Sequence, residues 1–336
     1  MHELPPLSLG IDIGGTKAHG LVLDAADQVL AQHVLPTAPS PEGVRITVSQ
    51  VTRALAETLR ISPASFTSVG LGIPGLVDHT RGVVTNAVNL SIEHCDLAGL
   101  LASDFAAPVR VENDLKATAL GAGLVLGRHA LDLTYISIGT GLSAAAVSDE
   151  RLVRGLHNGA GEIGHLAVDP GGERCRCGQR GCLETVLGGH YLSPRLAAQG
   201  LDLAGLDRNP DPAAAAERRR ITGALATVLT LAVVAYDSPT IALGGGVVRA
   251  APWLIGAVTA ELERRAADSP FLARHAIPAR LVAVPSGSPV AAIGAALVGR
   301  GQAAPGPATP PEKISVGSPA TPGMAPAFPF SSPLEG

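Results

Sequence analysis

A short segment at residues 159–184 holds three of the four cysteines of this 336-residue chain, together with a histidine. Cys175, Cys177 and Cys182 lie close together, and His165 precedes the first of them. Three thiolates and one imidazole form a four-ligand set of sulfur and nitrogen donors, which suits a closed, structural Zn²⁺ site. Glycines between the cysteines would let the backbone fold tightly around a small ion. The segment therefore predicts that His165, Cys175, Cys177 and Cys182 bind zinc.

Two other interpretations of these cysteines stay open. Ordinary buried cysteines would need no metal, although the ordered spacing Cys-x-Cys-Gly-x-x-Gly-Cys is unusual for core packing. A disulfide framework would need an even set of neighbouring thiols, whereas the fourth cysteine, Cys95, is distant in sequence. Zinc ligation is the preferred interpretation, even though Cys-x-Cys is less common in zinc sites than Cys-x-x-Cys.

A glycine-rich turn near the N-terminus could bind phosphate. The sequence Asp-Ile-Gly-Gly-Thr-Lys at residues 12–17 lies between apolar stretches at residues 7–13 and 18–23, which predict a β-hairpin. Such a turn presents backbone N–H groups and a hydroxyl to an anion, and Asp12 could hold Mg²⁺ through water. The alternative is a plain glycine-rich turn, because such turns are common.

A second glycine-rich turn between two predicted strands occurs later in the chain. A strand predicted at residues 135–138 leads into Gly-Thr-Gly at residues 139–141 and then into an apolar strand at residues 142–147. Two such hairpins predict a duplicated fold with two phosphate loops that face each other. A third cluster, Gly-Gly-Gly at residues 244–246, would let a flat ring such as adenine approach the backbone. Walker and Rossmann glycine patterns are missing from the sequence, which disfavours P-loop kinases and dehydrogenases.

Three carboxylates and an amide stand beside these motifs. Asn113 and Asp114 fall where a strand at residues 109–111 gives way to a helix, and ligands of open α/β sheets bind at such strand ends. Either residue could simply be a helix N-cap, but Asp114 facing two phosphate loops would also be placed as a general base. Glu162 and Glu184 flank the zinc segment. They are either solvated surface groups or acceptors for sugar hydroxyls that the zinc-pinned turn holds in place.

An alternation of strands and helices must position these groups. Further strands are predicted at residues 29–34, 69–73, 240–243 and 281–284, and helices at residues 42–59, 221–235 and 288–300, the last with Ser288 as N-cap. Residues 192–220 are predicted as short helices and a loop, with the three arginines at 218–220 on a solvated helix face. From residue 301 to residue 336 the chain is rich in Pro, Ala, Gly and Ser, which predicts a disordered tail.

Composition narrows the class of protein. Apolar residues make up 46% of the chain but aromatic residues only 3%, and the length predicts two domains or one large one. The net charge of −4 gives no electrostatic case for binding nucleic acid or an anionic membrane. The N-terminus lacks a signal-peptide pattern, and the longest apolar run, at residues 224–235, is shorter than the ~20 residues of a membrane span. We therefore expect a cytoplasmic protein, in keeping with free thiols at a metal site.

Together these motifs resemble those of the ROK family of sugar kinases and sugar-responsive repressors, within the hexokinase/actin-like ATPase fold. The resemblance covers residues 7–300 and is carried by the motifs at residues 12–17, 112–114, 139–141, 161–165, 175–184 and 244–247. It implies a duplicated α/β fold of the ribonuclease H-like type with a zinc-binding loop. We expect a small domain of residues 1–113 plus 289–300, completed by the final helix, and a large domain of residues 114–288.

The resemblance also implies roles for individual residues. Asp114 corresponds to the base that takes the proton from the 6-hydroxyl of a hexose. The sugar would be held by Asn113, Glu162, His165 and Glu184, with His165 facing both metal and sugar. ATP and its Mg²⁺ would be held by Asp12, Gly14, Gly15, Thr16, Lys17, Gly139, Thr140, Gly141, Gly244 and Gly245. Relatives are commonly dimers or tetramers, so a homodimer or homotetramer is expected.

The expected reaction is therefore ATP-dependent phosphorylation of a hexose, with glucose as the first choice. N-acetylglucosamine, N-acetylmannosamine and fructose are alternative substrates, because Ser-Ile-Glu at residues 91–93 stands where the family often has Pro-Gly-Trp. Polyphosphate stays open as a donor in place of ATP. A sugar-responsive repressor is disfavoured, because only six residues precede the first predicted strand and a helix-turn-helix needs more. A zinc-containing sugar binder without activity is the third interpretation.

Overall fold

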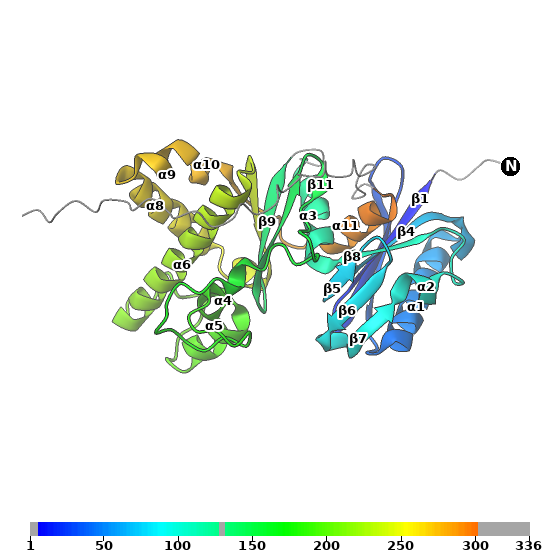
Figure 1. Cartoon of the computed structure of the whole chain (residues 1–336), viewed down its shortest axis with the longest axis horizontal. Helices are drawn as coiled ribbons and strands as arrows, with labels where there is room; N and C mark the ends of the chain where they lie inside the picture. The colour runs from blue at the N-terminus through cyan, green and yellow to red at the C-terminus, as the bar shows by residue number, and fades with distance from the viewer. Residues whose placement is uncertain (1–5, 128–131, 302–336) are drawn as a thin grey trace, which may run out of the picture. The chain divides into compact units, whose positions relative to one another are not determined.

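Two five-stranded sheets of the same plan form the framework of the protein (Figure 1). The computed structural model describes residues 6–127 and 132–301. In spatial order, the first sheet contains β3 (Val29–Pro36), β2 (Lys17–Leu23), β1 (Leu7–Ile13), β4 (Phe66–Ile73) and β8 (Val109–Asn113). The second contains β11 (Arg151–Leu152), β10 (Leu142–Ser148), β9 (Leu133–Ile138), β12 (Thr240–Gly244) and β13 (Leu281–Ala283).

The pairing of strands is also the same in the two sheets. The three strands at one edge pair antiparallel, and the remaining two join in parallel. Each glycine hairpin occupies the same place in its sheet, between β1 and β2 in the first and between β9 and β10 in the second. This equivalence confirms the predicted duplicated α/β fold.

A third, smaller sheet was not predicted. Its antiparallel strands are β5 (Leu76–Asp78), β6 (Val83–Ala87) and β7 (Ile92–Asp96). Strands of three to five residues are too short to show a clear alternation of apolar and polar side chains.

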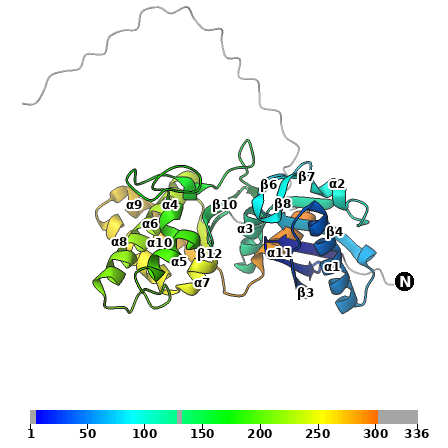
Figure 2. The ribbon, with the colours of Figure 1, turned by 90° about the horizontal axis from the view of Figure 1, so that it is seen from below.

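Helices and helical turns connect the strands. The first part of the chain contains α1 (Pro41–Leu59), η1 (Pro63–Ser65), η2 (Val88–Leu90), α2 (Leu97–Leu101) and α3 (Asp114–Val125). The second contains η3 (Ile163–His165), α4 (Leu183–Leu187), α5 (Gly189–Ala197), α6 (Pro212–Tyr236), α7 (Gly246–Ala250), α8 (Trp253–Ala267), α9 (Pro270–His275), α10 (Ile277–Arg280) and α11 (Val290–Gly299). Figure 2 shows α4 to α10 gathered around β12 and β10, and α11 apart from them beside α3.

Two helix boundaries differ from the prediction. Helix α6 begins at Pro212, earlier than predicted, because the carboxylate of Asp211 accepts a hydrogen bond from the amide of Ala213 at 2.8 Å and caps the helix. Arg218 thus lies within α6, and it donates to the carbonyls of the preceding loop instead of facing solvent. Helix α11 begins at Val290 with Pro289 at the N-cap position, so the cap predicted at Ser288 is wrong.

Helix α6 is a core helix. Among the described residues it is the one helix long and apolar enough to cross a membrane by length and composition, since it extends well beyond the apolar run at residues 224–235. Its residues Ile221, Leu225, Val228 and Leu229 recur at helical spacing and are fully buried in the core around the second sheet.

Alternate residues of β1 face two different layers, as the pleat of a strand requires. Leu9, Ile11 and Ile13 are fully buried in the first core, where they pack with α1. Gly10, which lies between them, faces α11 on the opposite side. Asp12 is on the same side as Gly10, and therefore on the side of the sheet that α3 and α11 cover.

Helix α11 lies directly on the backbone of the first sheet. A Cβ atom on Gly10 would overlap the carbonyl oxygen of Ala292, and one on Gly70 would overlap that of Ala295. The two glycines are neighbours in the register of β1 and β4. Gly121 of α3 approaches the backbone of α11 equally closely. The final helix therefore returns to the first sheet, as the resemblance implied.

We propose domain boundaries at residues 1–113 plus 289–300 and residues 114–288. The buried residues of the first core come from residues 7–111 and those of the second from residues 136–277. Helix α3 packs on α11 and also on β9 and β10, so it contacts elements of both proposed domains. The predicted disordered tail lies outside the described residues from residue 302 onward.

Replacing Gly70 with Val should destabilise the protein by about 3 kcal/mol or more, because the new side chain must displace the backbone of α11. The matched control is Gly256→Ala in α8, where a Cβ atom meets nothing within 4 Å. This control should be neutral or stabilise by ~0.5–1 kcal/mol, as expected for alanine in an open helical position. Urea unfolding measures both. A Gly70→Val protein as stable as the control would contradict the close packing of α11.

Candidate active site

Asp12 and Asp114 lie on either side of a glycine in β4. In the register of the sheet, Gly72 stands between Asp12 on β1 and Glu112 on β8. A Cβ atom on Gly72 would lie 3.5 Å from Cα of Asp114 and 3.7 Å from Oδ1 of Asp12. Both distances are ordinary van der Waals contacts, so the first turn of α3 lies directly against β4 and the two carboxylates are on the same face of the sheet.

The surroundings make both carboxylates more basic than usual. Burial raises the pKa of Asp114 above its ordinary value of 3.8, while the amide of Leu115 and the charge of Lys116 act in the opposite direction. Burial, with a further contribution from the charge of Asp114, raises the pKa of Asp12 to about 7, against an opposing effect of Lys17. A carboxylate with a raised pKa is a stronger base for abstracting a proton from a hydroxyl group.

Asn113 is the N-cap of α3. Its Oδ1 accepts from the amides of Leu115 at 3.1 Å and Lys116 at 3.2 Å. Its Nδ2 donates to Oδ1 of Asp114 at 3.0 Å and to the carbonyl oxygen of Gly75 at 3.1 Å. The capping role weighed in the sequence therefore falls to Asn113, and the amide of Asn113 also orients the carboxylate of Asp114.

Asn113, Asp114 and Glu162 line one cavity of about 310 Å³, which is of the size expected for a small-molecule site. Its other lining residues are Gly75, Leu76, Asn86, Leu115 and Ser143. The residues from the small sheet, Leu76 and Asn86, were missed because its strands were not predicted. The Pro-Gly pair at residues 74–75, where Gly75 has φ of +100°, is the signal that could have indicated a further hairpin there.

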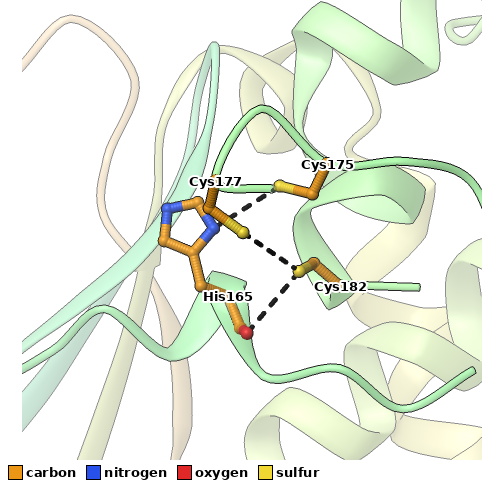
Figure 3. Close-up of side chains that lie close together, drawn as sticks. All are labelled: His165, Cys175, Cys177 and Cys182. Atoms are coloured by element: carbon orange, nitrogen blue, oxygen red, sulfur yellow. Dashed lines mark hydrogen bonds between the residues drawn. The ribbon is translucent and has the colours of Figure 1, made fainter. Parts of the chain in front are cut away.

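The four proposed zinc ligands converge (Figure 3). Their ligand atoms all lie within 4.8 Å of one another. Nδ1 of His165 is 3.6 Å from Sγ of Cys175, and Sγ of Cys177 is 3.6 Å from Sγ of Cys182. In tetrahedral zinc sites, metal bonds of ~2.0–2.3 Å place ligand atoms about 3.5 to 3.8 Å apart. The cluster is consistent with a zinc-binding motif, and its soft donor set fits zinc.

Tight turns in the backbone form this cluster. The amide of Gly178 donates to the carbonyl of Cys175 at 3.0 Å, with Gly178 at φ of +96°. Gly181, at φ of +69°, lies against the backbone of Asp169, where a side chain would overlap. The backbone amide of Gln179 is the main cause that lowers the pKa of the Cys177 thiol to about 6, which favours the thiolate that a metal requires.

His165 connects the cysteine cluster to the carboxylates. While Nδ1 faces Cys175, Nε2 lies 4.0 Å from Oε2 of Glu162. The side chain of Glu162 is 61% exposed, so its carboxylate is accessible on the wall of the cavity. One ring nitrogen of His165 thus faces the cysteine cluster and the other faces a carboxylate of the cavity. That His165 contacts both a metal and a sugar stays a prediction.

Glu184 contacts the second glycine hairpin. Its Oε2 accepts from the amide of Leu142 at 3.0 Å, and a Cβ atom on Gly141 would lie only 2.6 Å from the same oxygen. The carbonyls of Gly139 and Thr140 in turn accept from the first amides of α5. The turn at residues 139–141 is therefore fastened to α4 and α5, close to where the zinc segment ends.

The third glycine cluster packs against the second hairpin and lines another cavity. Gly245, at φ of +100°, lies against the backbone of Ile138 at the end of β9. The cavity has a volume of about 490 Å³, and Gly244 and Gly245 form part of its wall. Sequence reasoning missed most of its lining: Thr118, Tyr135, Val248, Arg249, Pro252, Ile255, Ala283, Val284, Pro285, Ser286, Gly287, Ser288, Val290 and Ala291.

The turn of the first hairpin is closed by its own backbone and packs against a neighbouring helical turn. The amide of Gly14 closes its turn by donating to the carbonyl of Lys17 at 2.9 Å, and Gly15 lies against Asn89. Thr16 and Lys17 are exposed. Among the described residues, no hydrogen bond joins this turn to residues 139–141, so the expectation that the two loops face each other across a phosphate stays a prediction.

The chain matches the ROK family over residues 8–301. The match covers nearly all described residues and every motif of the candidate site. This chain belongs to the ROK family.

Solved structures of ROK proteins share its fold. A ROK hexokinase from Thermus thermophilus superposes with a TM-score of 0.75 at 28% identity, covering 88% of this chain and 98% of that one. A ROK family glucokinase from Streptomyces griseus, solved with glucose and AMPPNP, superposes with a TM-score of 0.68 at 27% identity, covering 88% and 99%. The two-domain ROK fold with an actin-like ATPase core is thereby confirmed.

Curated relatives in the family have different functions. A glucokinase from Halalkalibacterium halodurans is 33% identical over 198 residues, which are 57% of this chain and 59% of the relative. An N-acetylmannosamine kinase from Citrobacter koseri is 32% identical over 203 residues, 60% and 67% of the two chains. A xylose repressor from Bacillus spizizenii is 30% identical over 179 residues, 53% and 46%. The chain thus matches less than two thirds of the length of the glucokinase.

Purified protein should contain zinc, and Cys175→Ser should lose it together with stability, because three ligands hold the ion less tightly than four. We expect the midpoint of thermal unfolding to fall by more than about 5 °C. The matched control is Cys95→Ser, a half-buried thiol outside the cluster. Metal analysis and thermal melts measure the effect. Wild-type protein free of zinc, or equal losses in both variants, would contradict the assignment.

Asp12→Asn should stabilise the protein above neutral pH in buffer without Mg²⁺. An acid whose pKa is raised on folding binds more protons in the folded state, so the free energy of unfolding falls as pH rises from about 4 toward 7. Asparagine does not ionise, so the Asp12→Asn protein does not lose stability in this way. Its gain in the free energy of unfolding over wild type should be complete above pH ~7 and vanish near pH ~4, as the raised pKa of Asp12 requires. Urea unfolding across this range measures it. A gain independent of pH would show that Asp12 is not the group responsible.

Proposed function

We propose that this protein transfers the terminal phosphoryl group of ATP to the 6-hydroxyl of a hexose, with glucose as the expected substrate. The observation that supports this most is Asp114, a carboxylate with a raised pKa that lies at the start of α3 and lines a cavity with Asn113 and Glu162. The S. griseus structure, a family member at 27% identity, was solved with glucose and an ATP analogue.

Asp114 would act as the general base. As the hydroxyl oxygen of the sugar forms its bond to the terminal phosphorus, its proton passes to the carboxylate of Asp114, and the bond from phosphorus to the bridging oxygen of ADP breaks. Asn113 would keep the carboxylate in position, because its Nδ2 donates to Oδ1 of Asp114 at 3.0 Å. The raised pKa of Asp114 makes it a better proton acceptor at neutral pH.

Carboxylates and an imidazole would hold the remaining hydroxyls of the sugar. Glu162 lies on the wall of the cavity, and Nε2 of His165 faces the carboxylate of Glu162. Oε2 of Glu184 already accepts a hydrogen bond from the amide of Leu142. We therefore expect the other carboxylate oxygen of Glu184 to accept a hydrogen bond from a sugar hydroxyl. Bound zinc would supply no chemistry to the reaction and would act as a structural ion that fixes His165.

ATP would occupy the glycine hairpins and the larger cavity. We infer that Gly139, Thr140 and Gly141 hold phosphates and that the base enters the cavity beside Gly244 and Gly245, whose backbones leave room for a flat ring. Gly14, Gly15, Thr16 and Lys17 would close over the terminal phosphate. Mg²⁺, held by Asp12 through water, would neutralise the charge of the phosphates.

The choice of sugar follows from the family only in part, since the curated relatives include both a glucokinase and an N-acetylmannosamine kinase. We propose glucose ahead of N-acetylglucosamine, N-acetylmannosamine and fructose. We also propose a homodimer or homotetramer, as the resemblance implied. The xylose repressor among the relatives makes DNA binding the alternative of another class.

A coupled assay of ADP release against a panel of hexoses and N-acetylhexosamines, with ATP or polyphosphate as donor, tests the proposal. We expect ATP-dependent turnover, fastest with glucose. A protein that releases no ADP with any sugar, but shifts its own upstream DNA in a gel, would be a repressor and the kinase proposal would fail.

Asp114→Asn should lower kcat by about 10² to 10⁴, the usual contribution of a general base, with little change in sugar binding. The wild-type rate should fall with decreasing pH through a pKa above 3.8, because burial disfavours the ionised form of Asp114 and only that form accepts the proton. The matched control is Asp104→Asn, which removes a carboxylate that is paired with Arg45 at 2.8 Å outside the candidate site and should keep full activity. Unchanged turnover in Asp114→Asn would remove Asp114 as the base.

A further inference from the structure

Two buried charges and one largely buried charge stand beside the candidate site and have no part in the proposed chemistry. Glu112 is 1% exposed, Lys116 is 5% exposed, and the side chain of Arg154 is 10% exposed. Burying charges is costly unless each group is paired and hydrogen-bonded. These three are paired across two segments of chain that are far apart in sequence, which indicates that the contacts hold those segments together.

The first contact is an ion pair. Arg154 lies in the segment after β11, and its Nη2 and Nε approach Oε2 of Glu112 at 2.7 Å and 2.8 Å. The other oxygen of Glu112 accepts from the backbone amide of Asn113 at 2.9 Å. One carboxylate therefore joins the guanidinium of Arg154 to the backbone of the residue next to Asp114.

The second contact comes from the first turn of α3. Nζ of Lys116 donates to the carbonyl oxygen of Asn158 at 3.0 Å. Burial lowers the pKa of Lys116, and the charge of Arg154 acts in the same direction, while the nearby negative charges of Glu112, Glu162 and Asp114 each oppose the shift. Lys116 is therefore a cation placed among the carboxylates of the site and bound to the loop between Arg154 and Glu162.

The loop at residues 154–161 carries Glu162 to the cavity. Its far end is fixed, because the amide of Ala144 donates to the carbonyl of Gly161 at 2.8 Å and the backbone of Gly161, at φ of +105°, lies against Ala144. Its near end is held by Arg154 and its middle by the bond from Lys116 to Asn158. Glu162 itself is 61% exposed, so its position depends on the backbone that carries it.

We propose that Lys116 and the Arg154–Glu112 ion pair are positioning residues for the sugar site. They join the strand-to-helix junction that carries Asn113 and Asp114 to the loop that carries Glu162, and so set the spacing between the base and a sugar-binding carboxylate. This inference rests on the proposed function. The hydrogen bonds and ion pairs described for Glu112 and Lys116 reach neither of the glycine turns at residues 14–17 and 139–141. Loss of these bonds should therefore affect the sugar site and leave the ATP site unchanged.

Kinetics of variants test the proposal. Lys116→Met removes the hydrogen bond and the charge, and should raise the KM for sugar roughly tenfold, as loss of a hydrogen bond from a charged group predicts. Glu112→Gln weakens the ion pair and should also raise the KM for sugar. The KM for ATP should stay at its wild-type value in both. Lys116→Arg keeps the cation and should restore most of the affinity for sugar.

The matched control is Arg265→Met. Arg265 is ion-paired with Glu261 at 2.8 Å and donates to the carbonyl of Gly223 at 2.9 Å, within the core of the second part of the chain. This variant should lose stability without any change in the KM for sugar. A merely structural role for Lys116 would give the same pattern as this control.

Several outcomes would overturn the proposal. These are a wild-type KM for sugar in Lys116→Met, an equal rise in the KM for sugar and for ATP, or an Lys116→Arg variant as impaired as Lys116→Met. If thermal melts show that Lys116→Met is unfolded, Glu112→Gln decides in its place, and a wild-type KM for sugar there refutes the inference. If the wild-type protein phosphorylates no sugar, the proposed function fails, and calorimetric titration with glucose then tests the positioning of the sugar site alone.

Discussion

The position of the candidate site depends on glycines at the centre of the first sheet, where no side chain separates the strands from the helix that covers them. Gly10 and Gly70 let α11 rest on the backbone of β1 and β4, where a Cβ atom would overlap the helix, and the first turn of α3 lies beside Gly72 at van der Waals distance. A side chain at Gly10 or Gly70 would push α11 outward. Because the helices lie so close, Asp114 at the start of α3 comes to the same face of the sheet as Asp12. The burial that raises the pKa of Asp12, and the smaller contribution from the charge of Asp114, both follow from this packing.

A second constraint links the metal cluster to the cavity. The imidazole ring of His165 has one nitrogen beside Cys175 and the other beside Glu162. An ion bound to the cluster would fix the ring, and the ring would limit where the exposed carboxylate of Glu162 can go. Glu184, two residues after Cys182, continues the connection to the second glycine hairpin through the amide of Leu142. Through its flanking residues, the segment that contains the cysteines thus reaches the wall of the smaller cavity at Glu162 and the second glycine hairpin at Leu142.

Much of this arrangement could be predicted from the sequence, and the reasons differ between its parts. The long strands and the two glycine hairpins have a clear period of two, so the duplicated sheets and the junction at Asp114 were accessible. The four zinc ligands were accessible because three thiols and an imidazole at close spacing are typical of a zinc site. The small sheet of β5, β6 and β7 was not, because its strands are too short to show a period, and Leu76 and Asn86 were missed with it. Lys116 and Arg154 were missed for another reason: a lysine or arginine in sequence resembles any solvated surface residue, and only tertiary contacts bury it.

The placement of α11 has a consequence for the order in which the molecule can be built. The face of the first sheet that holds Gly10 and Gly70 is covered by residues 290–299, although β1 and β4 are among the first elements of the chain. On a ribosome, α3 is the first helix available to cover part of this face, and the part that holds Gly10 and Gly70 stays uncovered until the last described helix has been synthesised. The packing of the first sheet is therefore complete only after residues 290–299 have been synthesised. A nascent chain interrupted before residue 290 would expose the glycine-lined part of this sheet to chaperones and proteases.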